Sequence, residues 1–337
     1  MGLAALPTIS VIIPTLNSSR TLEECLRTIR EQDYPPDAIE IVVADGGSID
    51  ATYEIAKRYD AVIVSNPLVT GEAGKAAALR AARNDIVALI DSDNIIVGRD
   101  WFRRMVAPFE EPSIVGTEPI RFVAIATDGT IDRYCAIAGA NDPLCLFIGV
   151  YDKYSAMTGK WTGLRIQDED RGDFRVFSLD QRLPTIGANG TLYRREQLAP
   201  IVGEYLIDID IPVILGQRHK SARFAKVQTG IRHLYCKDTS AFIRKQTRRV
   251  RDYFATGTGH SQRVYPWRRY AVNGALRLAV ACITVIPLLI QSGRAYARTR
   301  DFAAFYHPVA CWLTLGVYGL NFTFNRGRAM SRAQWRQ

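Results

Sequence analysis

The first ninety residues contain four short runs of apolar positions, separated by stretches with a different periodicity. Each run is apolar on nearly every position, which is typical of a strand buried on both faces of a parallel sheet. The stretches between them carry apolar residues three and four positions apart, as amphipathic helices do. The runs cover residues 8–14, 39–44, 61–65 and 86–90. This β-α-β-α-β-α-β alternation predicts an α/β fold with a mostly parallel, doubly wound, Rossmann-like sheet.

Acidic side chains stand at the ends of two of these runs. Asp45 ends the second run and precedes Gly46 and Gly47, and the fourth run stops at Asp91-Ser92-Asp93. The carboxyl ends of parallel strands meet at one edge of a sheet, where such folds bind ligands. Two carboxylates one residue apart repel, so we expect a cation beside them, and a divalent metal that also holds a diphosphate would supply it. The alternative is that both acids only cap a turn.

The C-terminal part contains two apolar stretches of 21 residues each, 272–292 and 304–324. Each is about as long as a helix that spans a bilayer. The first carries only Arg277, and arginines are denser outside the pair than between its members. By the positive-inside rule, both ends then lie in the cytoplasm. The alternative is a pair of buried or interfacial helices.

We therefore expect a catalytic domain over 1–237, a basic interfacial helix region over 238–271, two transmembrane helices within 272–324 and a basic cytoplasmic tail over 325–337. This layout predicts a multi-pass protein of the cell membrane whose catalytic domain is cytoplasmic. No signal peptide is expected, because the first apolar run meets Pro14 too soon. The six cysteines form no C-x-x-C pair, which favours a reduced compartment. A net charge of +9 favours anionic partners such as nucleotides or phospholipid head groups.

Four motifs in a fixed order are more specific than any of them alone. They read I-I-P-T-L-N, V-A-D-G-G-S-I-D-A-T, G-E-A-G-K-A-A-A-L-R and L-I-D-S-D-N. In this order they resemble the family 2 glycosyltransferases, over residues 9–254. The resemblance implies a GT-A fold, a nucleotide-diphosphate sugar as donor and a divalent metal, manganese or magnesium, as cofactor.

The resemblance also implies roles for particular side chains at the donor site. The loop from Pro14 to Asn17, with Leu16, would line the nucleotide pocket, and Asp45 would receive the base. Lys75 falls where the family has a basic or small residue beside the donor. Gly46 stands where a second acid is common, which leaves the identity of the donor base open. Implied donor-binding residues are Pro14, Leu16, Asn17, Asp45, Lys75, Asp91 and Asp93, and the last two would also hold the metal.

A catalytic base and a third metal ligand are implied further along the chain. Asp208 resembles the Asp of the family's E-D-x-D-L segment, which takes the proton of the acceptor hydroxyl in an inverting, in-line displacement. Ile207 replaces the usual Glu, and the alternative is that Asp208 caps a helix while Asp210 is the base. His233 matches a histidine that often joins the metal, although a lone His in a strand is commonly a core residue.

The basic stretch Q-T-R-R-V resembles the Q-x-x-R-W motif of the processive, cellulose-synthase-like branch, with Val for Trp. Arg249 would then contact the diphosphate and Gln246 the acceptor end. The alternative is a basic helix on anionic lipid. Asn141-Asp142-Pro143 and residues 158–180 receive no role from the sequence.

Together these features imply an inverting, metal-dependent, membrane-anchored glycosyltransferase that acts on a lipid-linked, isoprenoid phosphate glycan acceptor. Two membrane helices are too few for a polysaccharide channel, so we expect single-sugar addition. The chain resembles archaeal-type glycolipid mannosyltransferases of protein glycosylation, which makes GDP-mannose the expected donor and leaves no role for nucleic acid. The alternatives are a processive polysaccharide synthase and a non-catalytic scaffold that binds nucleotide and lipid. An oxidoreductase is disfavoured, because P-T-L-N replaces G-x-G-x-x-G.

Overall fold

The computed structural model describes residues 6–255 and 264–324, which fall into two compact units. The first unit comprises Met1–Ile120 and Arg165–His233, and the second comprises Arg121–Leu164 and Leu234–Gln337. The end of the first unit at His233 lies close to the expected boundary at residue 237. The sequence did not predict that Arg121–Leu164 would leave the catalytic domain and join the C-terminal helices. The expected basic tail over 325–337 lies outside the described residues.

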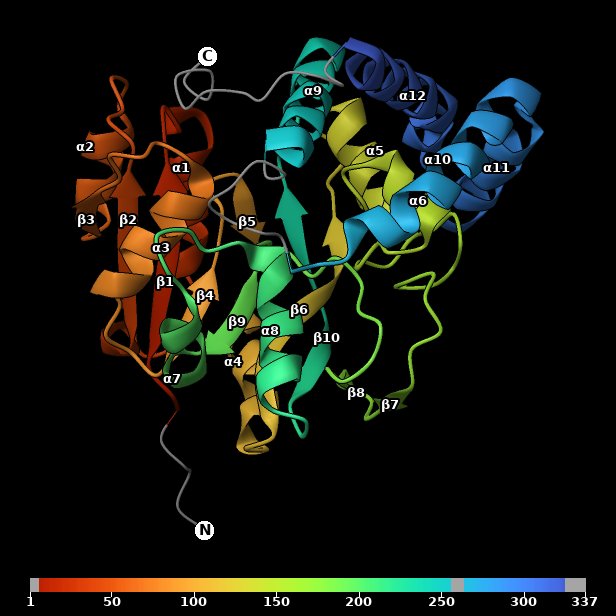
Figure 1. Ribbon diagram of the computed structural model, residues 1–337. Coiled ribbons are helices and arrows are strands. Elements are labelled where there is room, and N and C mark those ends of the chain that lie inside the picture. The colour runs from red at the N-terminus through yellow and green to blue at the C-terminus, as the bar shows by residue number, and fades with distance from the viewer. Residues whose placement is uncertain (1–5, 256–263, 325–337) are drawn as a thin grey trace. The chain divides into compact units, whose positions relative to one another are not determined.

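One sheet of mixed direction organises the first unit (Figure 1). Its strand order is β3-β2-β1-β4-β9-β6-β10-β8-β7, and β5 pairs with β10. The parallel part, β3-β2-β1-β4, is the one that the sequence alternation predicted. The strands are β1 (Ile9–Thr15), β2 (Ile39–Asp45), β3 (Val62–Ser65), β4 (Ile86–Leu89), β5 (Asn94–Ile96), β6 (Ile114–Val123), β7 (Asp168–Asp170), β8 (Phe174–Ser178), β9 (Thr191–Arg194) and β10 (Arg223–His233).

Helices connect the parallel strands and cover the sheet of the first unit. The best defined is α1, which buries Leu22, Cys25, Leu26 and Ile29, the apolar side that its 3.6-residue period produces. The helices are α1 (Ser19–Arg30), α2 (Thr52–Arg58), α3 (Gly71–Ala81), α4 (Trp101–Val106), α7 (Arg195–Leu198) and α8 (Ile211–Arg218), with 3-10 turns at η1 (Pro36–Ala38), η2 (Ala107–Glu110), η3 (Ala199–Ile201) and η4 (Asp208–Asp210).

Strand β10 is longer than the sequence indicated. From the sequence, a strand is expected over residues 231–236, whereas the structure has it over Arg223–His233, with Lys226 in its interior. Lys226 is fully buried, and it is paired with the fully buried carboxylate of Glu118 on β6. A buried charge needs such a partner. Since the partner lies 108 positions away in sequence, the periodicity of the strand could not reveal it.

The second unit is helical, and its core explains why Arg121–Leu164 belongs to it. Helix α6 packs against α10, α5 against η5, and α9 against α12. The apolar side chains of α5 and α6 therefore find cover on the C-terminal helices, in one cluster with Tyr235, Phe242 and Leu278. The elements are α5 (Thr130–Ala138), α6 (Pro143–Ile148), α9 (Thr239–Ala255), α10 (Trp267–Thr284), α11 (Ile286–Thr299), η5 (Phe302–Tyr306) and α12 (His307–Phe324).

The prediction of one continuous helix over 272–292 is wrong. The chain breaks at Val285, whose φ is +61°, and α10 and α11 meet there at 90°. Pro287 at the start of α11 has no N–H to continue the ladder of α10, which is the physical reason for the break. Within the described residues no helix by itself has the length and hydropathy to cross a bilayer, and the bent pair Tyr270–Thr284 and Ile286–Thr299 is the one combination that would.

Candidate active site at the carboxyl edge of the parallel strands

The ends of β1 and β2 build the first part of the site. Thr15 and Asp45 are register partners at the last position of the two strands. The Asp45 carboxylate accepts hydrogen bonds from the Thr15 hydroxyl at 2.9 Å, from the Ser48 hydroxyl at 2.6 Å, and from the Gly47 and Ser48 amides at 3.0 and 2.8 Å. Burial raises the pKa of Asp45, but these donors outweigh burial and hold it below its usual value.

Four donors occupy about all of the acceptor positions that a carboxylate offers. Asp45 therefore orders the loop that follows β2 in this structure. Asn17 also holds this loop. Its side-chain oxygen accepts a hydrogen bond from the Ile49 backbone amide at 3.0 Å, and its backbone amide donates to the Ser48 hydroxyl at 2.8 Å. Leu16 is 44% exposed beside them. The predicted contact of Asp45 with the nucleotide base stays a prediction.

Helix α3 places Lys75 against the end of β1. A Cβ on Gly74 would lie 2.9 Å from Pro14 Cβ and 2.9 Å from Asn66 Nδ2, so only glycine permits this approach. The first turn of the helix is fixed by Thr70, whose hydroxyl accepts from the Ala73 amide. Lys75 is consequently only 6% exposed.

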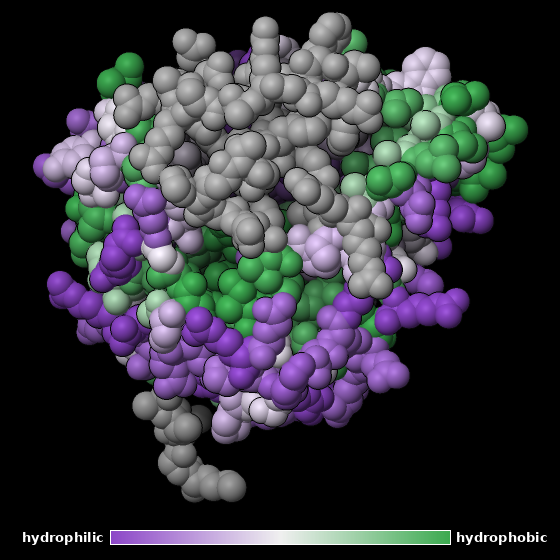
Figure 2. Space-filling model, viewed as in Figure 1, coloured by the Kyte–Doolittle hydropathy of each residue, from purple (hydrophilic) through white to green (hydrophobic). Residues whose placement is uncertain are grey.

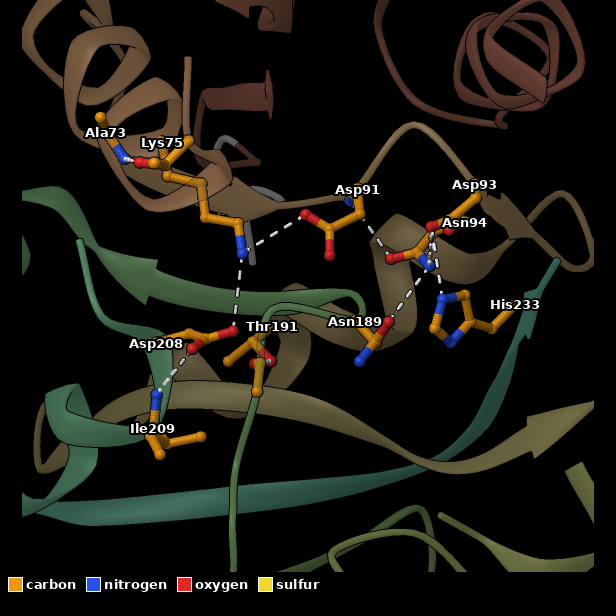
Figure 3. A network of polar contacts seen from close by, with 12 residues as sticks. Ala73, Lys75, Asp91, Asp93, Asn94, Asn189, Thr191, Asp208, Ile209 and His233 are labelled. Atoms are coloured by element: carbon orange, nitrogen blue, oxygen red, sulfur yellow. Dashed lines mark hydrogen bonds and ion pairs between the residues drawn. The ribbon is translucent and has the colours of Figure 1, made fainter. Parts of the chain in front are cut away.

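The buried ammonium of Lys75 lies between two carboxylates from distant parts of the chain (Figure 3). Its Nζ is 3.4 Å from Asp91 Oδ1 and 3.5 Å from Asp208 Oδ2. Burial alone would lower the pKa of Lys75, but the charges of Asp91 and Asp208 outweigh it and raise the pKa well above the usual value. Lys75 therefore carries a full positive charge at physiological pH.

Asp208 and Asp210 occupy different environments, although both belong to the turn η4. Asp208 faces Lys75, a quarter of its side chain is exposed, and its Oδ1 accepts from the Ile209 amide at 3.0 Å. Asp210 is only 3% exposed. A general base must reach the hydroxyl whose proton it takes. Of the two acids, Asp208 is the more exposed, and its role as the base stays a prediction.

Asp93 faces the last residue of β10. Its Oδ1 lies 3.3 Å from His233 Nε2, and Figure 3 shows these two side chains turned toward each other. The amide of Asn94 donates to Asp93 Oδ1 at 3.4 Å and to Asn189 Oδ1 at 3.2 Å. Asn94 is fully buried. Roles for Asn94 and Asn189 were not predicted from the sequence; for Asn94, its position directly after the Asp-x-Asp pair was the one available signal.

The expected metal ligands are only partly assembled. Within the described residues, no group of three or more His, Cys, Asp or Glu side chains is close enough to hold a metal ion. Asp91 is turned to Lys75, whereas Asp93 and His233 lie side by side. Two protein ligands fit a cation whose remaining positions are taken by a diphosphate and water. Asp93 and His233 are therefore the residues that would hold a manganese or magnesium ion.

The two candidate residues on α9 belong to the second unit. Arg249 lies 3.8 Å from Asp142 and over the ring of Tyr235. Gln246 is fully buried and donates to the main-chain oxygen of Asn141 at 2.9 Å. The Asn141-Asp142 pair, for which the sequence suggested no role, thus anchors the helix that carries both residues. The predicted contacts of Gln246 with the acceptor and of Arg249 with the diphosphate stay predictions.

Comparison with known proteins decides the family. Residues 10–199, more than half of the chain, match the profile of glycosyl transferase family 2. The chain belongs to this family. The resemblance seen in its four ordered motifs is thereby confirmed.

Curated relatives share only part of this chain. The glycosyltransferase AglE of Haloferax volcanii is 29% identical over 110 residues, which are 31% of this chain and 36% of AglE. The N-acetylglucosaminyltransferase of Bradyrhizobium elkanii is 31% identical over 117 residues, which are 32% of this chain and 63% of that enzyme. The alignments therefore span less than two thirds of either relative.

A solved structure extends the likeness of the fold. The mannosyltransferase PcManGT from Pyrobaculum calidifontis, in complex with GDP-Man and Mn²⁺, superposes with a TM-score of 0.52 and 18% sequence identity. The match covers 96% of this chain and 88% of PcManGT. At this identity the likeness concerns the fold, which is of the mixed α/β, GT-A type.

Proposed function

We propose that this protein is an inverting glycosyltransferase that moves a sugar from a nucleoside diphosphate to a hydroxyl of a lipid-linked glycan. The observation that carries the proposal is the convergence of Asp91, Lys75 and Asp208 at the carboxyl edge of the parallel strands, with Asp93 and His233 beside them. The buried cation compensates the charge of the two acids that it contacts, and a carboxylate in a position that the acceptor can reach is what a general base requires.

Each of these groups has a role in the proposed reaction. Asp208 takes the proton of the acceptor hydroxyl as that oxygen attacks the sugar from the side opposite the leaving diphosphate. Lys75 holds the Asp208 carboxylate in place and compensates the charge of Asp91, which would contact the ribose. The loop ordered by Asp45 and Asn17 would line the nucleotide pocket with Pro14 and Leu16.

Asp93 and His233 would hold the divalent cation, which when bound supplies positive charge to the leaving diphosphate. PcManGT has the same fold and is described with GDP-Man and Mn²⁺. This supports GDP-mannose as the donor and manganese as the metal of the present protein. A panel of nucleotide sugars with manganese or magnesium tests both, and transfer from UDP-glucose alone would reject the mannose assignment.

We also propose that the second unit attaches the protein to the cytoplasmic face of the cell membrane. Helix α10 exposes Val272, Leu276, Val280 and Ile283, which are spaced three and four positions apart and are 49–79% exposed. Ile286 and Leu289 continue this apolar surface on α11, and Figure 2 shows hydrophobic residues gathered where these helices lie. A soluble surface seldom leaves such a patch uncovered. Embedded helices would bring the catalytic unit to a lipid-linked acceptor.

Substitution of the proposed base tests the reaction. In the purified full chain, Asp208→Asn should abolish sugar transfer while donor binding, measured by calorimetry, is retained. Asp180→Asn is the matched control, because Asp180 is half-exposed and, among the described residues, its ion pair is with Lys220 on the surface. Full transfer by the Asp208→Asn protein would refute its role, and loss of transfer in Asp210→Asn alone would move the role to Asp210.

Two further measurements separate the remaining alternatives. The anomeric configuration of the product, read by NMR, tests inversion, and the product length on a defined glycolipid separates single addition from a processive synthase. Co-flotation with anionic vesicles tests the membrane attachment. It should be lost in Leu276→Asp/Ile283→Asp, and unchanged flotation of this variant would count against the attachment.

A further inference from the structure

A hollow of about 380 Å³ opens in the second unit. Its walls come from α6, the loop over 149–163, α10 and α11. The backbone at Gly149 and Gly163 is packed so closely that a Cβ on Gly163 would lie 2.7 Å from Gly149 Cα. This volume lies at the low end of the roughly 300–1,000 Å³ typical of small-molecule sites. All lining residues belong to the second unit, so the hollow is separate from the centre at Asp91 and Asp208.

Three cationic side chains from three elements line the hollow. They are Arg277 of α10, Arg294 of α11 and Lys160 of the loop. None of the described lining residues is acidic, and no described carboxylate forms an ion pair with any of the three. Two other arginines of this unit do have acidic partners, since Arg133 pairs with Asp301 and Arg249 lies 3.8 Å from Asp142. When cationic side chains gather without an acidic partner, a bound anionic ligand can compensate their charge.

The guanidinium groups suit a phosphate in particular. Planar N–H donors match two phosphate oxygens at once. Arg277 is also held by its surroundings, because its Nη1 lies 3.5 Å from the main-chain oxygen of Phe147. Arg277 is the single charge in the apolar stretch 272–292, and it is exposed in the structure. In the membrane setting proposed above, a charge without a ligand would be costly.

The surroundings of the hollow favour a lipid over a dissolved anion. Val280 lies one turn beyond Arg277 on α10 and is 49% exposed, and Ile290 lies one turn before Arg294 on α11 and is 48% exposed. A free phosphate gains nothing from these apolar neighbours, whereas the acyl chains of a lipid bury them.

We propose that this hollow binds the phosphate-bearing head group of an anionic membrane lipid, whose acyl chains lie along the exposed apolar sides of α10 and α11. The site rests on the membrane attachment proposed above and is independent of the sugar-transfer centre. Arg277 and Arg294 clamp the phosphate, and Lys160 adds charge from the loop.

Native mass spectrometry of the full chain in a neutral detergent tests the site. The probes are dioleoyl phosphatidic acid, dioleoyl phosphatidylcholine and inorganic phosphate. The wild-type chain should bind one phosphatidic acid more tightly than either other probe. A hydrogen bond to a charged group contributes enough that each arginine should account for roughly tenfold in affinity, and Arg277→Gln/Arg294→Gln together for roughly a hundredfold.

The control is Arg99→Gln/Arg218→Gln, which removes the same charge from exposed positions of the first unit and should bind like wild type. Circular dichroism checks that both double variants fold. Equal binding of phosphatidylcholine would overturn the phosphate clamp, and equal binding of inorganic phosphate would reduce the hollow to a free-anion site. Wild-type affinity of Arg277→Gln/Arg294→Gln would also refute the proposal. Nucleotide-sugar hydrolysis, measured in parallel, reports on the proposed enzyme function separately.

Discussion

Replacement of Lys75 by methionine tests directly whether this lysine bridges Asp91 and Asp208. Methionine keeps the length and apolar stem of the side chain but removes the cation between Asp91 and Asp208. The two carboxylates would then repel each other without compensation. We expect Lys75→Met to destabilise the fold and to slow transfer, because the Asp208 carboxylate is then no longer held in place by the lysine.

The expected loss of stability in Lys75→Met follows from the distances of the two ion pairs. At 3.4 and 3.5 Å, each lysine–carboxylate pair is worth roughly 4–5 kcal/mol at an effective dielectric constant of about 20. Removing one partner of a buried pair costs about 3–5 kcal/mol. The Asp91 and Asp208 side chains are 34% and 25% exposed, so water relieves part of this cost. We therefore expect the low end, about 3 kcal/mol.

The pH dependence of this loss has a definite sign. The pKa of Lys75 is raised in the folded state, so its stabilisation is fully present below the ordinary lysine value of about 10.4 and is lost only as the pH rises through the folded value. The difference in unfolding free energy between wild type and Lys75→Met should therefore be constant from about pH 6 to 9.

Urea denaturation at several pH values measures this difference. The control is Lys220→Met, which breaks a Lys–Asp pair whose lysine is 73% exposed and should cost less than about 1 kcal/mol. If Lys75→Met lost no more stability than Lys220→Met, or if it transferred sugar at the wild-type rate, the bridging role of Lys75 would be refuted.

Four other changes have definite expected outcomes. Asp93→Ala should lose metal-dependent donor binding in calorimetry, and unchanged affinity with manganese would contradict its role. Asp45→Asn should weaken donor binding by roughly tenfold, because the loop after β2 loses hydrogen bonds that order it. The pKa of Asp45 is lowered in the folded protein. The stability that the Asp45 carboxylate contributes in wild type is therefore lost only as the pH falls below about 3.9. Gly74→Ala should cost about 1–3 kcal/mol against Pro14, whereas Gly71→Ala, with open space around it, should not. Chelation of metal should leave the melting temperature unchanged, since Lys75 already compensates Asp91.

Local patterns were sufficient for the parallel half of the sheet. The four apolar runs became β1 to β4. Strands β1, β2 and β4 are almost entirely buried, as strands covered on both faces are, whereas β3 at the edge of the sheet is partly exposed. The patterns failed where a polar residue is buried against a distant partner, as Lys226 is against Glu118. They also failed at Val285: the apolar composition of 272–292 favoured one helix, although Pro287 weakens such a span, and the chain breaks there.

The site shows the same division between local and distant information. Asp45, Asp91 and Asp93 could be placed at one edge from strand order alone, since each follows a parallel strand. The pairing of Lys75 with Asp208 joins residues 133 positions apart, and no spacing in the sequence encodes it. Only the packing of Gly74 on Pro14 brings the lysine to that position.

This pairing changes how the charges of the Asp-x-Asp motif are balanced. The sequence suggested one cation shared by both acids, because like charges so close must be compensated. In the structure Asp91 is compensated by Lys75, and Asp93 lies with His233 on the other side of Asn94. In the proposed reaction a metal would therefore serve the diphosphate, and the fold would not depend on it. The side chains at this edge of the sheet can therefore be in place before donor and metal bind. Substrate binding then does not have to provide the free energy that orders them.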